Sequence, residues 1–175
     1  MKLHIINKST VPLVIFLFSI SSLLGADWPM WGKDGSRNMV SDEKKITFDF
    51  VAGEMRDDEV VDMKTTKNLR WVAKLGSQAY GNVTIGNGCV FVGTNNESPR
   101  DPGKKGDRGV VMCLDEKSGE LKWQLVIPKL GAGKVSDWEY IGICSSTAID
   151  GDKVYVVTNR CEVVCLDIHG LTNGN

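Results

Sequence analysis

Two parts of the chain repeat each other, and this repetition constrains the fold more than any other feature of the sequence. Positions of the first copy recur 64 residues later, where Ile85, Val90, Val92, Thr94 and Asn95 match Ile149, Val154, Val156, Thr158 and Asn159. Residues 111–115 match residues 163–167 at an offset of 52, so the first copy carries about twelve additional residues, 97–108. Both copies alternate β-branched runs with Asn-Gly or Asp-Gly turns, which is typical of β-hairpins. The repeated unit is therefore a group of short antiparallel strands.

A period of roughly 50 residues with four short strands indicates the blades of a β-propeller. We expect one blade at about residues 80–126 and a second at 143–175, with residues 68–73 as an outer strand before the first blade. Because one blade cannot bury both faces of its sheet, blades must stack on neighbours. Propellers close with about 4–8 blades. The sequence therefore predicts an all-β fold with only about two four-stranded blades present, a fragment that aggregates or stays partly unfolded on its own.

The N-terminus has the pattern of an export signal over residues 1–26. A short cationic leader precedes an apolar run at residues 11–24, and Gly25 and Ala26 supply the small residues that a signal peptidase needs. The run has about 14 residues, whereas a membrane-spanning helix needs about 20. A membrane anchor or a buried core helix is the alternative interpretation. We expect an exported protein, periplasmic or secreted, with no stable membrane span once the signal is removed.

The mature chain divides into two further parts. Residues 27–67 form an N-terminal extension, whose charged segment at 41–67 has no strand period and is expected to be a surface excursion. Residues 68–175 form the partial propeller.

Composition excludes several classes of function. The chain has 21 Lys and Arg against 22 Asp and Glu, a formal charge of −1, so it lacks the basic footprint of a nucleic-acid-binding protein. His169 is the only histidine after the signal, which leaves no Ser–His–Asp set and a poor supply of zinc ligands. Cys161 and Cys165 lie roughly 13 Å apart if their segment is a strand, too far for a disulfide. We expect the five cysteines to be small apolar core residues.

One stretch carries a recognisable motif. Residues 113–123 read Cys-Leu-Asp-Glu-Lys-Ser-Gly-Glu-Leu-Lys-Trp. This resembles the repeat of pyrroloquinoline-quinone-like (PQQ-like) β-propellers, Ala-x-Asp-x-x-x-Gly-x-x-x-Trp, with Asp115, Gly119 and Trp123 at the matching positions. We expect Asp115 and Gly119 to shape a turn and Trp123 to pack between blades. The second copy keeps Asp167 but loses the Gly and Trp register after Gly170. The opening residues 27–32 also resemble the N-termini of secreted bacterial proteins of this superfamily.

The resemblance implies a fold of the quinoprotein alcohol dehydrogenase-like type, but several activities. Our leading hypothesis is an exported binding or scaffolding module without catalytic residues of its own. The alternative is the N-terminal part of a PQQ-dependent dehydrogenase that oxidises an alcohol or sugar, for which the resemblance admits PQQ with calcium as cofactors. Such enzymes typically show two adjacent cysteines, and no Cys-Cys dipeptide exists here. A third possibility is an outer-membrane assembly factor, although those are usually lipoproteins and no Cys follows Ala26.

The loops that precede the innermost strands supply the candidate ligand site, because such loops converge on a propeller's channel. Trp138 and Glu139 offer a stacking surface and a carboxylate, and Ser145 and Ser146 offer hydrogen bonds; the alternative is that these side chains pack or solvate a connecting loop. Residues 131–136 resemble a phosphate-binding loop, but that loop requires Ser or Thr directly after the lysine, and Val135 stands there. Expected partners are the remaining blades or a partner chain, and a small-molecule or protein ligand.

Overall fold

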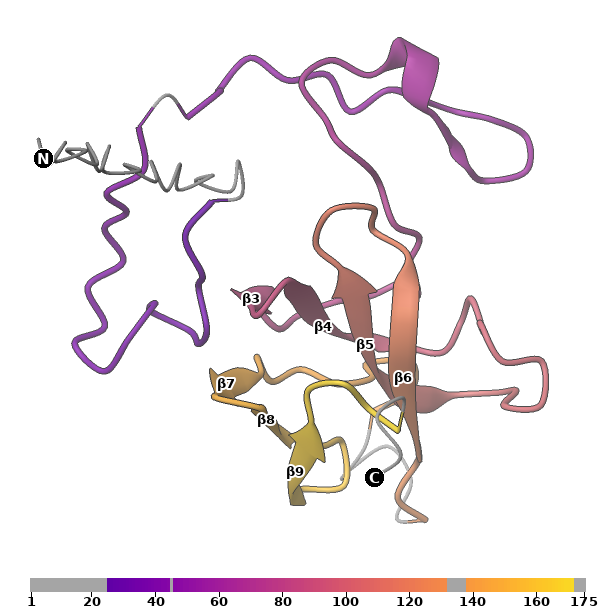
Figure 1. Cartoon of the computed structure of the whole chain (residues 1–175). Helices are drawn as coiled ribbons and strands as arrows, with labels where there is room; N and C mark the ends of the chain where they lie inside the picture. Colours follow the sequence, from indigo (N-terminus) through magenta and orange to yellow (C-terminus); the bar gives the residue numbers. More distant parts are fainter. Residues whose placement is uncertain (1–24, 45, 132–137, 172–175) are drawn as a thin grey trace, which may run out of the picture.

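The computed structural model describes residues 25–44, 46–131 and 138–171. Within these ranges the chain is all-β, with two antiparallel sheets side by side and a small hairpin apart from them (Figure 1). The predicted signal, except for Gly25 and Ala26, and most of the loop at 131–136 lie outside the described residues. No helix in the described part is long and apolar enough to cross a membrane.

The first sheet is a complete four-stranded blade. Its strands follow one another in the order β3 (Thr84–Gly86), β4 (Cys89–Asn95), β5 (Arg108–Asp115) and β6 (Leu121–Pro128). The β3–β4 turn consists of Asn87 and Gly88, both with positive φ, as the Asn-Gly pattern predicts. The additional residues of the first copy form the loop between β4 and β5, where the change of offset placed them.

The second sheet repeats the first three strands. It consists of β7 (Ala148–Asp150), β8 (Lys153–Val157) and β9 (Val163–Asp167) in that order. Tyr155 pairs with Cys165 as Phe91 pairs with Cys113, so the two sheets share one register. Among the described residues, no strand pairs with the other edge of β9. The prediction of an all-β propeller fold with about two blades is confirmed.

The core lies on both faces of the first blade, because β4 and β5 are apolar at successive positions. Phe91 and Cys113 face the second blade and pack with Val154 and Ile168, while Met112 lies on the opposite face. Full burial of a side chain such as Phe91 contributes roughly 1.5–3 kcal/mol. Burial on both faces therefore fixes these two strands as the centre of the structure.

Residues 68–73 do not form the outer strand that the sequence predicted. They run as an extended segment without a sheet partner, since the blade to which they would belong is not among the described residues. Trp71, Ala73 and Leu75 nevertheless cover the outer face of the first blade. The prediction of a strand at these residues is therefore wrong.

The N-terminal extension touches both inner strands. Trp28 exchanges two backbone hydrogen bonds with Ile85, of 2.8 and 2.9 Å, and the amide of Ile149 donates to the carbonyl of Pro29 at 2.7 Å. Further along, β1 (Glu54–Met55) and β2 (Val61–Asp62) form a hairpin followed by the short 3₁₀ helix η1 (Met63–Thr65). The charged segment thus contains a small exposed hairpin.

The cysteines are of two kinds, which corrects the expectation that all five are core residues. Cys89 and Cys113 are buried between the blades, whereas Cys144, Cys161 and Cys165 are exposed. Cys165 lies in the outer part of the second blade, where no described element covers the sheet, and Cys161 lies in the β8–β9 turn with φ 60°.

Candidate functional site

The Asp–Gly–Trp motif builds a repeated docking unit. Asp115 ends β5, and one oxygen of its carboxylate accepts hydrogen bonds from the backbone amides of Ser118 and Lys117, at 3.0 and 2.9 Å. These bonds hold the pKa of Asp115 below its ordinary value. The amide of Gly119 closes the turn by donating to the carbonyl of Asp115 at 2.8 Å. The motif is therefore a hydrogen-bonded turn that presents a glycine.

A tryptophan of the preceding repeat lies on that glycine. Trp71 donates its indole N–H to the carbonyl of Glu116 at 2.9 Å. A Cβ at Gly119 would lie 2.4 Å from Trp71 Cδ2, and the residue has φ +74°. Both the close approach and the backbone conformation require glycine here.

The second copy performs the same docking with a turn that is one residue shorter. Trp123 donates to the carbonyl of Ile168 at 2.9 Å, the equivalent of the bond from Trp71. Gly170 has φ +63°, and a Cβ there would lie 2.8 Å from the indole of Trp123. Asp167 shapes this turn by accepting from the amide of His169 at 2.7 Å. The motif spacing is lost, as the sequence indicated, but the packing is kept.

Trp123 therefore joins the two blades, as expected from the motif. Its ring lies 5.7 Å from that of Phe91, centroid to centroid, at 57° between planes. The inter-blade core also contains Ile149 and Val154. One indole thus contacts the sheet of its own blade and the turn of the next.

The two candidate serines are hydrogen-bonded within the scaffold. The Ser145 hydroxyl donates to the carbonyl of Val157 at 2.7 Å and accepts from the amide of the same residue at 3.2 Å. The Ser146 hydroxyl accepts from the amide of Asn82 at 2.8 Å, which ties the second blade to the loop before β3. Among the described residues, no hydrogen bond joins either serine to Trp138.

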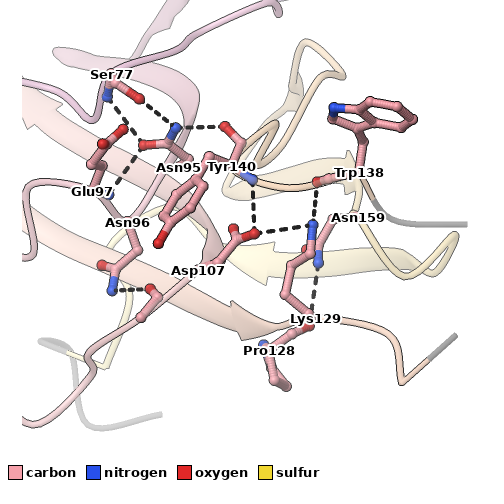
Figure 2. A network of polar contacts seen from close by, with 11 residues as sticks. Ser77, Asn95, Asn96, Glu97, Asp107, Pro128, Lys129, Trp138, Tyr140 and Asn159 are labelled. Atoms are coloured by element: carbon pink, nitrogen blue, oxygen red, sulfur yellow. Dashed lines mark hydrogen bonds and ion pairs between the residues drawn. The ribbon is translucent and has the colours of Figure 1, made fainter. Parts of the chain in front are cut away.

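Trp138 and Glu139 lie in the same connection between β6 and β7 as the two serines, closer to β6. The indole of Trp138 is 61% exposed, and its carbonyl accepts from the ammonium group of Lys129 (Figure 2). Glu139 is exposed as well. Ser145, Ser146 and Trp138 are thus hydrogen-bonded to Val157, Asn82 and Lys129 respectively.

The polar centre of this region is Asn95, which the sequence analysis did not single out as a site residue. Its side chain is fully buried, and the carbonyl oxygen accepts from the amides of Ser77 and Glu97, each at 3.1 Å. The amide group donates to the Ser77 hydroxyl at 2.9 Å and to the carbonyl of Tyr140 at 2.6 Å (Figure 2). Asn95 thereby connects the segment entering the first blade with the loop entering the second. The recurrence of Asn95 as Asn159 was the available signal.

The insertion loop contributes a partly buried ion pair to the same network. One carboxylate oxygen of Asp107 accepts from the amide of Tyr140 at 2.7 Å and lies 3.5 Å from the ammonium of Lys129. The side chains of Asp107 and Lys129 are only 17% and 20% exposed. Nearby, the side-chain amide of Asn159 donates to the carbonyl of Pro128 at 3.2 Å. The insertion loop is therefore held at this end by partly buried contacts, and the network connects the two blades.

The resemblance admits PQQ with calcium as cofactors of such a fold. PQQ with calcium needs a carboxylate-rich set of ligands around the metal. Within residues 25–44, 46–131 and 138–171, no three His, Cys, Asp or Glu side chains are grouped in a way that fits a metal ion. The described residues do not form this site, and no chemical step through it follows from them.

Two antiparallel sheets, the first docked on the second through Trp123 and a glycine turn, with the equivalent docking of Trp71 on the turn of the first, define a β-propeller repeat protein. A family model, PQQ_2, described as outer membrane protein assembly factor BamB, matches residues 31–170. The chain therefore belongs to this family of PQQ-like repeat proteins, which confirms the resemblance carried by Asp115, Gly119 and Trp123. A comparison with curated proteins found no match.

Proposed function

We propose that the chain is a protein-binding propeller module that docks a partner on the outer face of its second blade. One observation carries the proposal. Phe91 and Val111 are fully buried in the first blade, whereas their repeat equivalents in the second, Tyr155 and Val163, are 37% and 74% exposed. Val157 on the same face is 47% exposed. In this fold, such a face is buried by a neighbour, which is either a further blade or a partner chain, and this face is the one through which we expect the module to bind.

The family description supports a scaffolding role. The matching family is described as an outer membrane protein assembly factor, and assembly factors work through contacts with other proteins. In the described structure, Ser145, Ser146 and Asn95 are hydrogen-bonded within the scaffold. Binding through a sheet face uses the blade itself and leaves these connections in place.

Photocrosslinking in the host cell tests the docking surface. A benzoylphenylalanine at position 163 is expected to give protein-sized adducts, because the side chain there lies on the exposed face. The matched control is position 117, an exposed lysine on a turn of the first blade. Equal adducts at both positions, or none at position 163, would contradict the proposal.

We also propose that the chain is exported, on the strength of the leader pattern that ends at Gly25 and Ala26. Mass spectrometry of the protein from fractionated cells is expected to find an N-terminus at Asp27 in the periplasmic or secreted fraction. An uncleaved N-terminus in the cytoplasmic fraction would overturn this part of the proposal.

A further inference from the structure

Residues 27–30 cross the first strands of both blades. β3 and β7 are edge strands of their sheets, and in a propeller these first strands line the central channel. Residues 27–30 bind both edges, and we call them the axial strap. They open the motif at residues 27–32, which takes no part in the proposed docking surface.

Consecutive carbonyls of the strap bind equivalent amides of the two blades. Ile85 and Ile149 are repeat equivalents, 64 residues apart. The amide of Ile85 donates to the carbonyl of Trp28 at 2.9 Å, and the amide of Ile149 donates to the carbonyl of Pro29 at 2.7 Å. An edge amide without a partner is open to any strand that approaches. The strap therefore closes the same position on both edges.

The residues of the strap suit this crossing. Trp28 also donates its backbone amide to the carbonyl of Ile85 at 2.8 Å, so it pairs with β3 in the antiparallel sense. Pro29 has no amide hydrogen to leave unpaired, and proline within sheets is confined to such edge positions. The chain then turns at Gly32, which has φ +82°, and a Cβ there would lie 3.0 Å from Arg37 Cδ. The sequence of this motif therefore fits a segment that binds two edges and then turns.

Direct contacts between the blades lie beside the strap. The side-chain amide of Asn87 donates to the carbonyl of Gly151 at 2.9 Å, and its backbone amide donates to the carboxylate of Asp27 at 3.4 Å. The buried hydroxyls of Thr84 and Thr147 are hydrogen-bonded to each other. The strap therefore lies at a junction where the two blades already meet, and it adds hydrogen bonds to each of them.

We propose that the axial strap is a clamp that holds the first and second blades together and closes the channel-side edges of β3 and β7. The clamp opens as one unit, because adjoining residues hold both amides. A ligand or strand that binds these edges must first displace Trp28 and Pro29. The clamp acts on the channel side of the blades, whereas the proposed docking surface is the outer face of the second blade.

Native-state hydrogen exchange of the purified full chain in low urea, measured at single residues by electron-transfer fragmentation, tests the clamp without any substitution. One opening event predicts that the amides of Ile85 and Ile149 have protection factors within about tenfold of each other, although they lie in different blades. A larger difference, or exchange of either amide at the rate of an unpaired one, would overturn the clamp.

A double substitution in the strap adds a causal test. Trp28→Gly with Pro29→Gly removes the indole and the fixed proline backbone, and it is expected to speed exchange of both edge amides by at least about tenfold. Met39→Gly with Val40→Gly, at side chains 59% and 63% exposed in the same extension, is the matched control that changes neither. The amide of Val111, which is fully buried in β5, shows whether each variant is folded.

Two results in the folded strap variant would overturn the clamp. Faster exchange of Ile85 alone would show that the strap belongs to the first blade only. Unchanged protection of both amides would show that the strap does not hold them. If Val111 exchanges together with both amides, the variant is unfolded, and the comparison of Ile85 with Ile149 in the unsubstituted chain decides.

Discussion

Replacing Gly170 by alanine tests the docking of Trp123 on the second blade. The new Cβ would lie 2.8 Å from Cγ and Cδ1 of the indole, whereas carbon atoms in contact are ordinarily about 3.5 Å apart. The ring must therefore shift by about 0.7 Å, which strains the 2.9 Å bond to the carbonyl of Ile168. Losing that bond costs about 1 kcal/mol. Alanine in the left-handed region costs roughly another 1–2 kcal/mol.

Gly151→Ala is the matched control, because it carries the same free-energy cost of alanine at positive φ but brings the new Cβ into contact with nothing. Gly151 also has positive φ, +55°, but a Cβ there would have no heavy atom within 4 Å. We expect Gly170→Ala to lower the free energy of unfolding by about 2–3 kcal/mol and Gly151→Ala by about 1–2 kcal/mol. The difference of about 1 kcal/mol is the energy of the hydrogen bond between Trp123 and Ile168.

Pulse proteolysis in urea at low protein concentration measures both values without the aggregation that a fluorescence melt invites. Equal destabilisation by the two substitutions would refute the reasoning, since it would mean that the indole does not rest on Gly170. A further variant, Trp123→Phe, loses the indole N–H and part of the ring's packing in the inter-blade core, and is expected to destabilise the chain more than Gly151→Ala.

Three other predictions follow from single groups. The pKa of Asp115 is lowered in the folded chain. Its carboxylate therefore stabilises the fold fully above the ordinary pKa, and this stabilisation is lost as the pH falls through the pKa of the folded state. Below about pH 4, the free energy of unfolding is expected to fall less in Asp115→Asn than in the wild type, as an acid titration of unfolding will show. Asn95→Ala leaves buried amide and carbonyl partners unsatisfied and is expected to cost about 2–3 kcal/mol in urea titration; an unchanged midpoint would contradict this. Burial, with Cys89 as neighbour, raises the pKa of the Cys113 thiol, so a thiol reagent at pH 8 is expected to label Cys161 rapidly and Cys113 only on unfolding, as mass mapping of labelled peptides will show.

Much of the fold could be predicted from the repeat. Because Val90 and Val154, or Val92 and Val156, are matched and buried, the offset of 64 located equivalent strands before any contact was known. The change of offset likewise located the insertion between β4 and β5. Strand periodicity and hairpin turns are local signals of the sequence, and a repeat shows each of them in two copies.

The parts that could not be predicted depend on distant contacts. Residues 68–73 have the same Leu-x-Trp pattern as β6, but a strand needs a partner, and pattern alone does not supply one. Gly170 lies under Trp123 as Gly119 lies under Trp71, although it comes one residue earlier after the aspartate of its repeat. The turn of the second blade is one residue shorter than that of the first, while the indole occupies the equivalent place. A search for the motif at its fixed spacing therefore misses Gly170.

The candidate site was the least predictable part. Ser145 and Ser146 precede the inner strand β7, as expected. Their hydroxyl groups are hydrogen-bonded to backbone groups of Val157 and Asn82, and the sequence does not show which backbone groups lie near them in the fold. The Asn95 side chain is central because it is hydrogen-bonded both to Ser77, which precedes the first blade, and to Tyr140, which precedes the second. Only its recurrence as Asn159 hinted at this role. Asp107 is likewise drawn into the network by Lys129, which is remote in sequence.

Hydrogen–deuterium exchange of the purified chain compares β5 with its repeat equivalent β9 in one experiment. β5 pairs with strands on both sides, whereas β9 pairs only with β8 among the described strands. In an antiparallel strand with one partner, about every other amide lacks a hydrogen bond. We therefore expect peptides covering residues 109–115 to stay protected while about half of the amides in residues 163–167 exchange at once. Equal protection of the two strands in the chain alone would show that the edge of the second blade is already filled, and would contradict the open two-blade structure described above.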